Sequence, residues 1–295
     1  MTVCCDVGDC MKNLVVHNGV FHADDAFAVA VIQMAIGEVE VVRTRDQAKI
    51  DQADFIVDVG GKSDGEKFFD HHQKGGAGTR ENGFPFASAG LVWRKFGAEV
   101  CGSQEVADKV DMDLIQFIDS ADCGFGVKPD AQTASDLVSS MNPGWYETPD
   151  FDGAFLKAVV MATSILERDI ARAKGEVLAK SEVEAALVKR EKTEILVLER
   201  FAPWHETVLS LAPEVLYVVF PAAGDAGQWN IQCVPVSKES FEKKKALPAA
   251  WAGKRGAELA AETGISDAVF CHIGLFIAGA ASKAGVVKMA ELAVL

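Results

Sequence analysis

Short apolar runs alternate with longer helical patterns along the first half of the chain. Apolar residues fill or alternate along the short runs, and they recur at helical spacing in the longer stretches. The pattern predicts strands over 12–16, 38–43 and 54–58, and helices over 24–36, 86–96 and 103–121. Strands that alternate with helices are typical of a parallel sheet, so we expect an α/β fold.

The second half opens with a long stretch that contains no proline. Residues 153–192 are rich in Ala, Leu, Val, Glu and Lys, which predicts one long helix or two abutting helices. Beyond it the pattern predicts strands over 194–198, 215–220, 229–236 and 267–271, and helices over 254–263 and 283–293. We therefore expect two domains, 1–190 and 193–295, with residues 1–12 as a flexible tail.

The composition agrees with a two-domain globular protein. The chain has 295 residues, of which 49% are hydrophobic and 24% are charged. Its apolar runs are shorter than the roughly 18–20 residues that span a bilayer. The first residues also lack a basic flank followed by an apolar core. The sequence thus predicts no membrane segment, no signal peptide and an intracellular, cytoplasmic location.

Negative charge is concentrated in the first half. The net charge is −14, and residues 1–150 carry 12 basic and 25 acidic side chains. An acidic chain is a poor non-specific binder of duplex nucleic acid, because backbone affinity grows with the number of phosphates neutralised. The acidic groups form either a solvated surface or, in part, a site for cations.

The cysteines indicate a reducing compartment. None of the seven forms a Cys-x-x-Cys pair, which argues against a zinc ribbon or a redox dithiol. Cys4, Cys5 and Cys10 fall in the predicted tail, where exposed thiols or a metal clip would fit. The other four are expected to be buried as small hydrophobic residues.

Histidines and aspartates gather where the predicted elements end. The groups are His17-Asn-Gly-Val-Phe-His22-Ala-Asp24-Asp25, Asp58-Val-Gly-Gly, Asp70-His71-His72 and Asp119-Ser-Ala-Asp122. Ligands of an α/β sheet bind beyond the carboxyl ends of its strands, so these side chains are expected to meet. Imidazole and carboxylate together suit Mn²⁺, Zn²⁺ or Fe²⁺ better than Mg²⁺ or Ca²⁺. The candidates are too many for one tetrahedral ion, but two ions about 3.5–4 Å apart with one bridging carboxylate would use them.

Three common enzyme motifs are incomplete or absent. Gly61-Lys62-Ser63 lacks the first glycine of a P-loop, because Ile56 stands at that position. The segment around Ser88 lacks the first glycine of a nucleophile elbow, and no Gly-x-Gly-x-x-Gly follows the first strand. These gaps argue against a P-loop NTPase, a serine hydrolase and a dinucleotide dehydrogenase.

A candidate anion site lies near the C-terminus. Residues 270–283 run from a predicted strand through small residues into a helix that begins near Lys283. Backbone N–H groups at a helix start favour anions, although a tight strand-to-helix crossing explains the same small residues. Basic residues over 238–255, with Phe241 and Trp251 between them, form either a phosphate-contacting patch or, more simply, a solvated face.

Several motifs together resemble one known superfamily. His-x-Gly-x-Phe-His-Ala-Asp-Asp at 17–25, Asp-Val-Gly-Gly at 58–61 and Asp-His-His-Gln at 70–73 resemble the DHH phosphoesterases. Within them the chain is similar to the melanocyte-proliferating-gene (Myg) family. Further segments agree with that family, at 87–93, 203–204, 247–253 and 270–272. The resemblance covers nearly the whole chain from Asn13.

The resemblance implies a Rossmann-like catalytic domain and a smaller α/β C-terminal domain, with the substrate in a cleft between them. By similarity, one Mn²⁺ would be bound by His17, His22 and Asp58, and a second by Asp24, Asp58, His71 and Asp122. Mg²⁺, Zn²⁺ and Fe²⁺ are the alternative ions. His22 stands where most of the superfamily carries aspartate, and Asp119 is the alternative to Asp122. His72 and Asp25 would support catalysis or face the substrate, and the residues expected to bind its phosphate are His272, Gly279 and Lys283, together with His72.

The resemblance favours a metal-dependent phosphoesterase with 3′–5′ exonuclease activity on single-stranded RNA or short oligonucleotides, by attack of a metal-activated water. The first alternative is a hydrolase of a small nucleotide or phosphorylated metabolite, which the low basicity favours. The second is a metal-binding scaffold without turnover. The sequence leaves the oligomeric state open.

Overall fold

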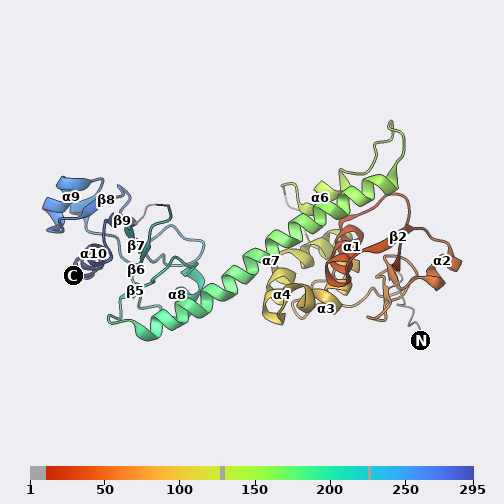
Figure 1. Ribbon diagram of the computed structural model, residues 1–295, viewed down its shortest axis with the longest axis horizontal. Coiled ribbons are helices and arrows are strands. Elements are labelled where there is room, and N and C mark those ends of the chain that lie inside the picture. The colour runs from red at the N-terminus through yellow and green to blue at the C-terminus, as the bar shows by residue number, and fades with distance from the viewer. Residues whose placement is uncertain (1–10, 127–129, 225–226) are drawn as a thin grey trace, which may run out of the picture. The chain divides into compact units, whose positions relative to one another are not determined.

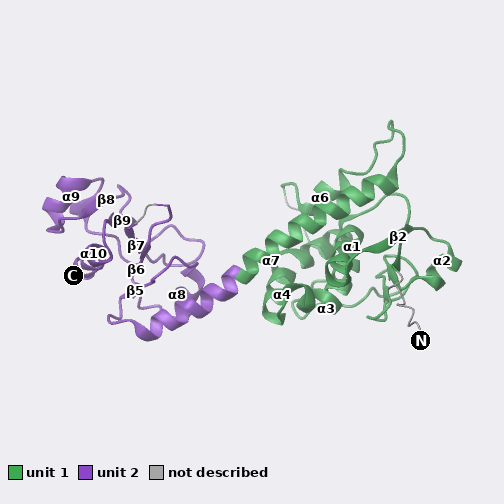
Figure 2. Cartoon of the chain, viewed as in Figure 1, with its two compact units in different colours: residues 1–174 green, residues 175–295 purple. Residues whose placement is uncertain are grey.

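The computed structural model describes residues 11–126, 130–224 and 227–295. The chain forms two compact units, residues 1–174 and 175–295 (Figure 2). The boundary falls inside one long helix, α7 (Phe151–Lys189), which contributes residues to both units. This helix matches the long proline-free stretch of the sequence.

Unit 1 is built on a four-stranded parallel sheet (Figure 1). The strands are β1 (Lys12–Val16), β2 (Val39–Arg43), β3 (Phe55–Val57) and β4 (Phe68–Phe69), in the order β2-β1-β3-β4. In the centre, Leu14 is paired with Phe55 and Ile56 with Phe68. Because all four strands run in parallel, their carboxyl ends lie at one edge of the sheet. The predicted α/β class is therefore confirmed.

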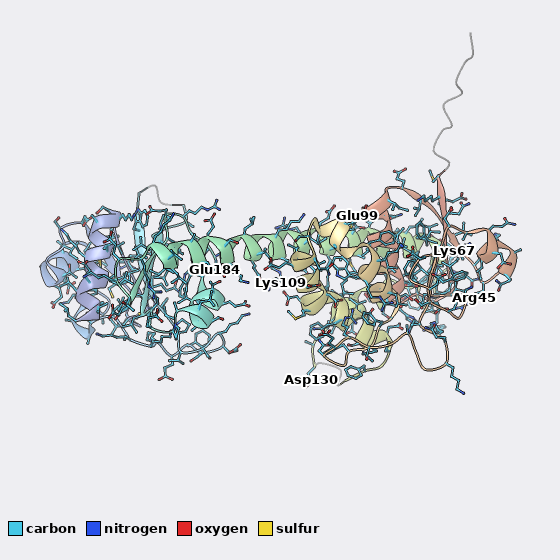
Figure 3. All side chains as sticks on the ribbon, turned by 90° about the horizontal axis from the view of Figure 1, so that it is seen from below. Arg45, Lys67, Glu99, Lys109, Asp130 and Glu184 are labelled. Atoms are coloured by element: carbon cyan, nitrogen blue, oxygen red, sulfur yellow. The ribbon has the colours of Figure 1, made fainter. Side chains whose placement is uncertain are left out.

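Helices complete unit 1. They are α1 (Ala23–Ile36), α2 (Gln47–Gln52), α3 (Ser88–Cys101), α4 (Gln104–Val110), α5 (Gln116–Asp122) and α6 (Ala134–Ser139), with a π-helical segment at Asp111–Ile115. Helix α1 packs along α3 and is buried on every side from Ala23 to Ile32, as expected for a helix that is apolar all round. Charged side chains such as Arg45 and Glu99 project from the surface of this unit (Figure 3).

Unit 2 contains a mixed five-stranded sheet in the order β5-β6-β7-β9-β8. Its strands are β5 (Ile195–Val197), β6 (Tyr217–Pro221), β7 (Trp229–Cys233), β8 (Ala268–Cys271) and β9 (Ile277–Ala280). Its helices are α8 (His205–Leu211), α9 (Gly256–Thr263) and α10 (Lys283–Val294), with a 3₁₀ turn at Ala249–Trp251. Tyr217 and Val219 enter one hydrophobic core and Val218 enters the other, so both faces of the sheet are covered.

Strand β9 is one of the elements that the sequence pattern does not predict. Residues 277–280 look like a loop of small residues, but Ala278 and Gly279 pair with Ile231 and Asn230 inside the sheet. A Cβ atom at Gly279 would lie 2.7 Å from Cε1 of Phe270. Small residues are needed here because neighbouring side chains fill the space, not because the chain turns.

The predicted N-terminal tail and the predicted burial of the other cysteines can be compared with the described residues. The predicted tail with Cys4, Cys5 and Cys10 lies outside the described residues, apart from Met11 and from Lys12, which begins β1. Cys101, Cys233 and Cys271 are buried free thiols, whereas Cys123 is exposed. In the described part of the chain, no helix has both the length and the apolar character needed to cross a membrane.

Candidate metal centre

The predicted ligands of unit 1 come together at the carboxyl edge of the parallel sheet. His17 follows β1, Asp58 follows β3, and His71 lies just beyond β4. Asp24 lies in the first turn of α1, and Asp122 is the last residue of α5. Parallel strands end at the same edge, so segments far apart in the sequence deliver their side chains to one place.

Asp58 lies at the centre of this cluster. It is 3% exposed, and its carboxylate lies 3.2 Å from Nε2 of His17 and 3.3 Å from Nε2 of His71. The Ser88 hydroxyl donates a hydrogen bond of 2.9 Å to the same carboxylate. Asp58 has a φ of 53°, in the left-handed region that residues other than glycine seldom adopt. A strained backbone at such a position is typical of functional sites.

His71 reaches the other carboxylates of the cluster. Its Nε2 atom lies 3.0 Å from Oδ2 of Asp122, 3.3 Å from Oδ1 of Asp58 and 3.8 Å from Oδ2 of Asp24. The three carboxylates that the resemblance assigns to the second ion together with His71 thus lie around one imidazole nitrogen.

His17 and Asp25 form the opposite side of the cluster. Nε2 of His17 lies 2.9 Å from Oδ2 of Asp25, and both side chains are buried. The other oxygen of Asp25 accepts the backbone N–H of His22, so Asp25 also fixes the start of α1. Asp25 therefore orients two of the candidate ligands.

His22 and His72 are the solvent-exposed members of the cluster. Their side chains are 55% and 60% exposed, whereas Asp24 and Asp58 are buried. Nδ1 of His22 lies 3.3 Å from Oδ1 of Asp122. Nδ1 of His72 lies 2.8 Å from Oδ1 of Asp70, and buried Asp70 also accepts the backbone N–H groups of Gly61 and His72. Asp70 therefore holds His72 in place.

The arrangement of donor atoms fits divalent cations. Three groups bring ligand atoms within 4.8 Å of one another: His17 with His22 and Asp58, His22 with Asp24 and Asp122, and Asp58 with His71 and His72. Within the described part of the chain, four buried polar atoms of the cluster have no partner with hydrogen-bond geometry, despite the short distances between them: His17 Nε2, Asp24 Oδ1, Asp25 Oδ2 and His71 Nε2. Such atoms are costly in a protein interior unless a cation or proton joins them. Mixed imidazole and carboxylate donors suit Mn²⁺, Zn²⁺ or Fe²⁺.

The electrostatics of the cluster also point to bound cations. Burial disfavours a charged imidazole, but the carboxylates of Asp25 and Asp58 outweigh it and raise the pKa of His17 to about 10. Burial, and then the neighbouring carboxylates of Asp58 and Asp122, raise the pKa of Asp24 well above its ordinary value. The surroundings of His17 and Asp24 thus favour their protonated forms in the metal-free protein. Divalent cations would replace those protons.

Asp119 and Asp122 lie one turn apart on α5 but have different surroundings. Asp119 is fully buried, lies 2.8 Å from Nη2 of Arg80 and accepts the N–H of Gly90 at 2.9 Å. Burial raises the pKa of Asp119 to about 7, although Arg80 opposes that shift. Among the described residues, Asp122 belongs to one of the candidate metal-ligand groups and Asp119 does not.

Two neighbours of the cluster were not assigned from the sequence. Ser88, which fails as a nucleophile elbow, is the first residue of α3, and its N–H points to Asp24 at 3.3 Å while its hydroxyl contacts Asp58. Sγ of Cys123 lies 3.7 Å from Nδ1 of His71. The signal for Ser88 was its place in the segment 87–93, which resembles the Myg family.

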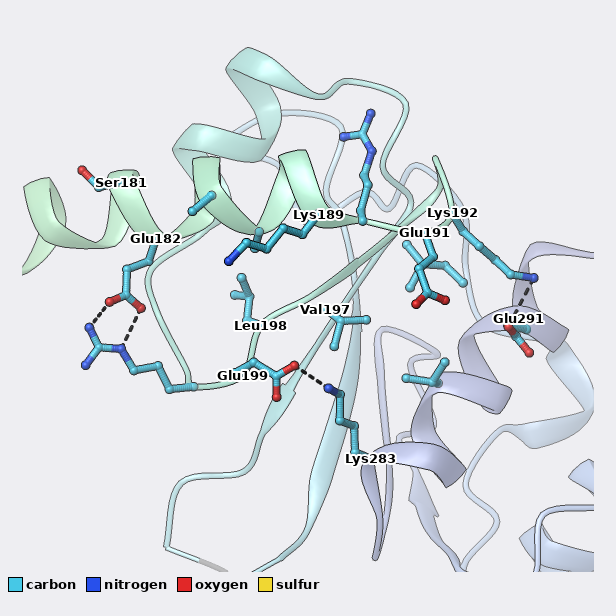
Figure 4. Close-up of a pocket in the computed structure, with 16 residues that line it drawn as sticks. Ser181, Glu182, Lys189, Glu191, Lys192, Val197, Leu198, Glu199, Lys283 and Glu291 are labelled. Atoms are coloured by element: carbon cyan, nitrogen blue, oxygen red, sulfur yellow. Dashed lines mark hydrogen bonds and ion pairs between the residues drawn. The ribbon is translucent and has the colours of Figure 1, made fainter.

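The candidate phosphate-binding residues of unit 2 have their own contacts. Nδ1 of His272 accepts the N–H of Gly274 at 2.9 Å, and Gly279 is buried in β9. Lys283 forms an ion pair with Glu199 at a pocket of about 670 Å³ that α7, β5 and α10 line (Figure 4). Among the described residues, no hydrogen bond or ion pair joins His272, Gly279 and Lys283. In the basic segment, Lys244 and Lys245 donate to backbone carbonyls.

Comparison with known proteins gives one consistent result. A family model named MYG1_exonuc and described as "Uncharacterised protein family (UPF0160)" matches residues 13–294. The "MYG1 protein" of Schizosaccharomyces pombe is 30% identical, over 96% of this chain and 98% of the relative. The "MYG1 exonuclease" of Homo sapiens is 31% identical, over 93% of this chain and 84% of the relative. A solved structure, a "pGpG-specific phosphodiesterase" of Vibrio cholerae, aligns over 96% of this chain and 97% of its own, with 12% identity and a TM-score of 0.34. At that score the likeness carries no argument about residues.

Proposed function

Because the chain belongs to the MYG1 exonuclease family (UPF0160), we propose that it is a divalent-metal-dependent 3′–5′ exonuclease that acts on RNA or short oligonucleotides. The relatives of Bos taurus and Homo sapiens are named exonucleases, which are hydrolases of phosphodiester bonds. The observation that carries the proposal is the convergence of His17, His22, Asp24, Asp58, His71 and Asp122 at one sheet edge, with buried ligand atoms that lack partners.

The six residues would hold two ions, Mn²⁺ by preference, with Asp58 shared between them. When bound, such a pair neutralises charge on a phosphoryl oxygen and lowers the pKa of a water nucleophile. The Asn18 carbonyl contacts Nδ1 of His17, whereas Asp25 contacts the same Nε2 atom that faces the cluster. The Ser88 hydroxyl fixes the carboxylate of Asp58. Supports of this kind hold ligands in the geometry that the ions require.

His72 has the position of a proton-transfer group. Asp70 engages its Nδ1 atom at 2.8 Å, which leaves Nε2 free on an imidazole that is 60% exposed. A buried carboxylate on one nitrogen fixes the ring and its tautomer, so the other nitrogen can face the substrate. We propose that His72 gives a proton to the leaving oxygen or binds the phosphate beside it.

In unit 2, His272, Gly279 and Lys283 are the proposed phosphate-binding residues. Lys283 is paired with Glu199, so it would exchange that carboxylate for a substrate phosphate. The exchange would cost little free energy, because exposed ion pairs such as this one contribute only about 0–1 kcal/mol.

The test is turnover of metal-loaded protein on a panel of dinucleotides, longer single-stranded RNA, single-stranded DNA, duplex RNA and nucleoside monophosphates. The proposal predicts Mn²⁺-dependent release of mononucleotides from the 3′ end, fastest with oligomers of a few nucleotides. Preference for monophosphates would favour the small-metabolite alternative, which the acidity of residues 1–150 supports. Metal binding without turnover on any substrate would indicate the scaffold alternative.

A further inference from the structure

Three phenylalanines form an exposed aromatic cluster on unit 1. The ring of Phe84 packs edge-on against Phe117, with centroids 5.7 Å apart, and at a tilt against Phe125, at 5.4 Å. Phe117 and Phe125 are 54% and 49% exposed. The rings come from three segments, namely the loop before α3, helix α5 and the turn after α5. We call this set the phenylalanine cluster.

The segments that carry the phenylalanine cluster also carry the metal centre. Phe125 follows Asp122 by three residues, and between them Cys123 lies 3.7 Å from His71. Sγ of Cys123 also lies 3.9 Å from the carbonyl oxygen of Phe86, which leads into α3. Phe125 is thus three residues from the candidate ligand Asp122, in a segment whose Cys123 contacts the candidate ligand His71.

Hydrogen bonds hold these segments in position. The Phe125 N–H donates to the Ser120 carbonyl at 2.9 Å, and the Asn82 amide donates to the Gln116 side chain at 2.8 Å. Arg80 binds the Pro85 carbonyl together with Asp111 and Asp119. The cluster is thus a built surface on fixed backbone.

The size of the exposed aromatic area indicates a small planar ligand. A phenylalanine side chain offers roughly 200 Å², so Phe117 and Phe125 together expose on the order of 200 Å². A stable protein interface needs about 800 Å² from each partner. The exposed area of the two rings is far below that, but it is sufficient for one flat heterocycle.

The charges around the cluster favour stacking over contacts to phosphate. Arg80, which donates to the Pro85 carbonyl beside Phe84, is already bound to two aspartates, and their attraction outweighs the effect of burial and raises its pKa. Stacking of a base on an aromatic ring needs no cation and is tolerant of sequence. Single-stranded RNA is commonly bound in this way.

From these observations we infer that the phenylalanine cluster is a stacking platform for a nucleobase next to the phosphate that the metal centre holds. This inference rests on the proposed function, because it takes a nucleotide chain as the substrate. It narrows the substrate to one that carries a base beside the scissile phosphate.

The test compares a trinucleotide with the same trinucleotide made abasic at single positions, each labelled at its 5′ end. Affinity is measured by fluorescence anisotropy and hydrolysis is measured separately, both with Mn²⁺-loaded full-length protein. The variants are F117A, F125A and F125W. The matched control is F201A, which removes a 55% exposed phenylalanine that packs edge-on against Phe220 in unit 2. Circular dichroism and unfolding temperature establish that each variant is folded.

We expect F117A and F125A to lower affinity for the base-containing trinucleotide about 5- to 150-fold, the range for loss of one stacked base. Affinity for one of the abasic trinucleotides should be unchanged by either variant, because that analogue has no base to stack. F125W should retain wild-type affinity, and F201A should change nothing.

Equal losses on base-containing and abasic chains would overturn the inference, as would a loss with F201A of the same size. A dimer that dissociates in F117A, seen by sedimentation velocity, would instead make the cluster an interface between copies. Base-dependent binding without hydrolysis would refute the exonuclease and leave the platform standing. Equal rates of hydrolysis for base-containing and abasic chains would refute the platform and leave the exonuclease standing.

Discussion

Replacement of Asp24 by asparagine should stabilise the metal-free protein while it removes metal binding. Asp24 is fully buried, and burial together with Asp58 and Asp122 raises its pKa. In the metal-free protein it must take up a proton or remain charged among other carboxylates. Asparagine has the same shape, carries no charge and can still accept the Ser88 N–H that Asp24 accepts at 3.3 Å.

The magnitude follows from linkage. An acid whose pKa is higher in the folded state binds more protons when folded, so stability falls as pH rises above the unfolded value, here 3.8. Each pH unit costs about 1.4 kcal/mol until the folded pKa is reached, which sets an upper limit of about 4 kcal/mol at pH 7. We expect D24N to recover about 1–3 kcal/mol of this at pH 7 and almost nothing below pH 4.

The assay is urea unfolding of metal-free protein at several pH values, repeated with Mn²⁺. Wild type should gain stability from Mn²⁺, whereas D24N should be more stable without it, gain much less from it and lack exonuclease activity. D130N, at an exposed position, is the matched control and should behave as wild type. A D24N protein that is less stable than wild type at pH 7 would refute the account of Asp24 as a buried acid kept for metal binding.

Three further predictions follow from the same geometry. S88A removes the hydroxyl that donates to Asp58, so it should lower Mn²⁺ affinity about 10- to 100-fold in equilibrium dialysis, and S88T should partly restore that affinity. Unchanged affinity in S88A would show that Ser88 does not support the metal centre. Because the pKa of His17 is raised to about 10, Mn²⁺ binding near pH 7 should release protons and become tighter as pH rises. Calorimetry in buffers of different ionisation enthalpy measures the protons released, and their absence would contradict a protonated His17 in the metal-free protein. H72Q should lower kcat about 10²- to 10⁴-fold and leave Mn²⁺ affinity nearly intact. A loss of metal binding instead would make His72 a ligand.

The sequence was sufficient to predict most of unit 1, because a parallel sheet imposes a strong rule. Once His17 and Asp58 were placed at the ends of predicted strands, their meeting at one edge followed. The proline-free pattern predicted helix over 153–192 but left open one helix or two, and the structure has one helix of 39 residues, α7.

What the sequence could not predict depends on contacts between distant residues. Asp119 and Asp122 share a helix face, and only the position of Arg80, 39 residues from Asp119, separates their environments. The bond between Ser88 and Asp58 spans 30 residues and leaves no local pattern. Strand β9 was missed because Gly279 is small to fit Phe270, a requirement that exists only in the folded sheet.

The central claim is that two cations share Asp58 at the edge of the unit 1 sheet. Anomalous scattering from crystals soaked in Mn²⁺ tests it most directly. The account predicts two adjacent peaks about 3.5–4 Å apart, one against His17, His22 and Asp58 and the other against Asp24, Asp58, His71 and Asp122. A single tetrahedral ion at this edge, or no peak there at saturating Mn²⁺, would contradict it.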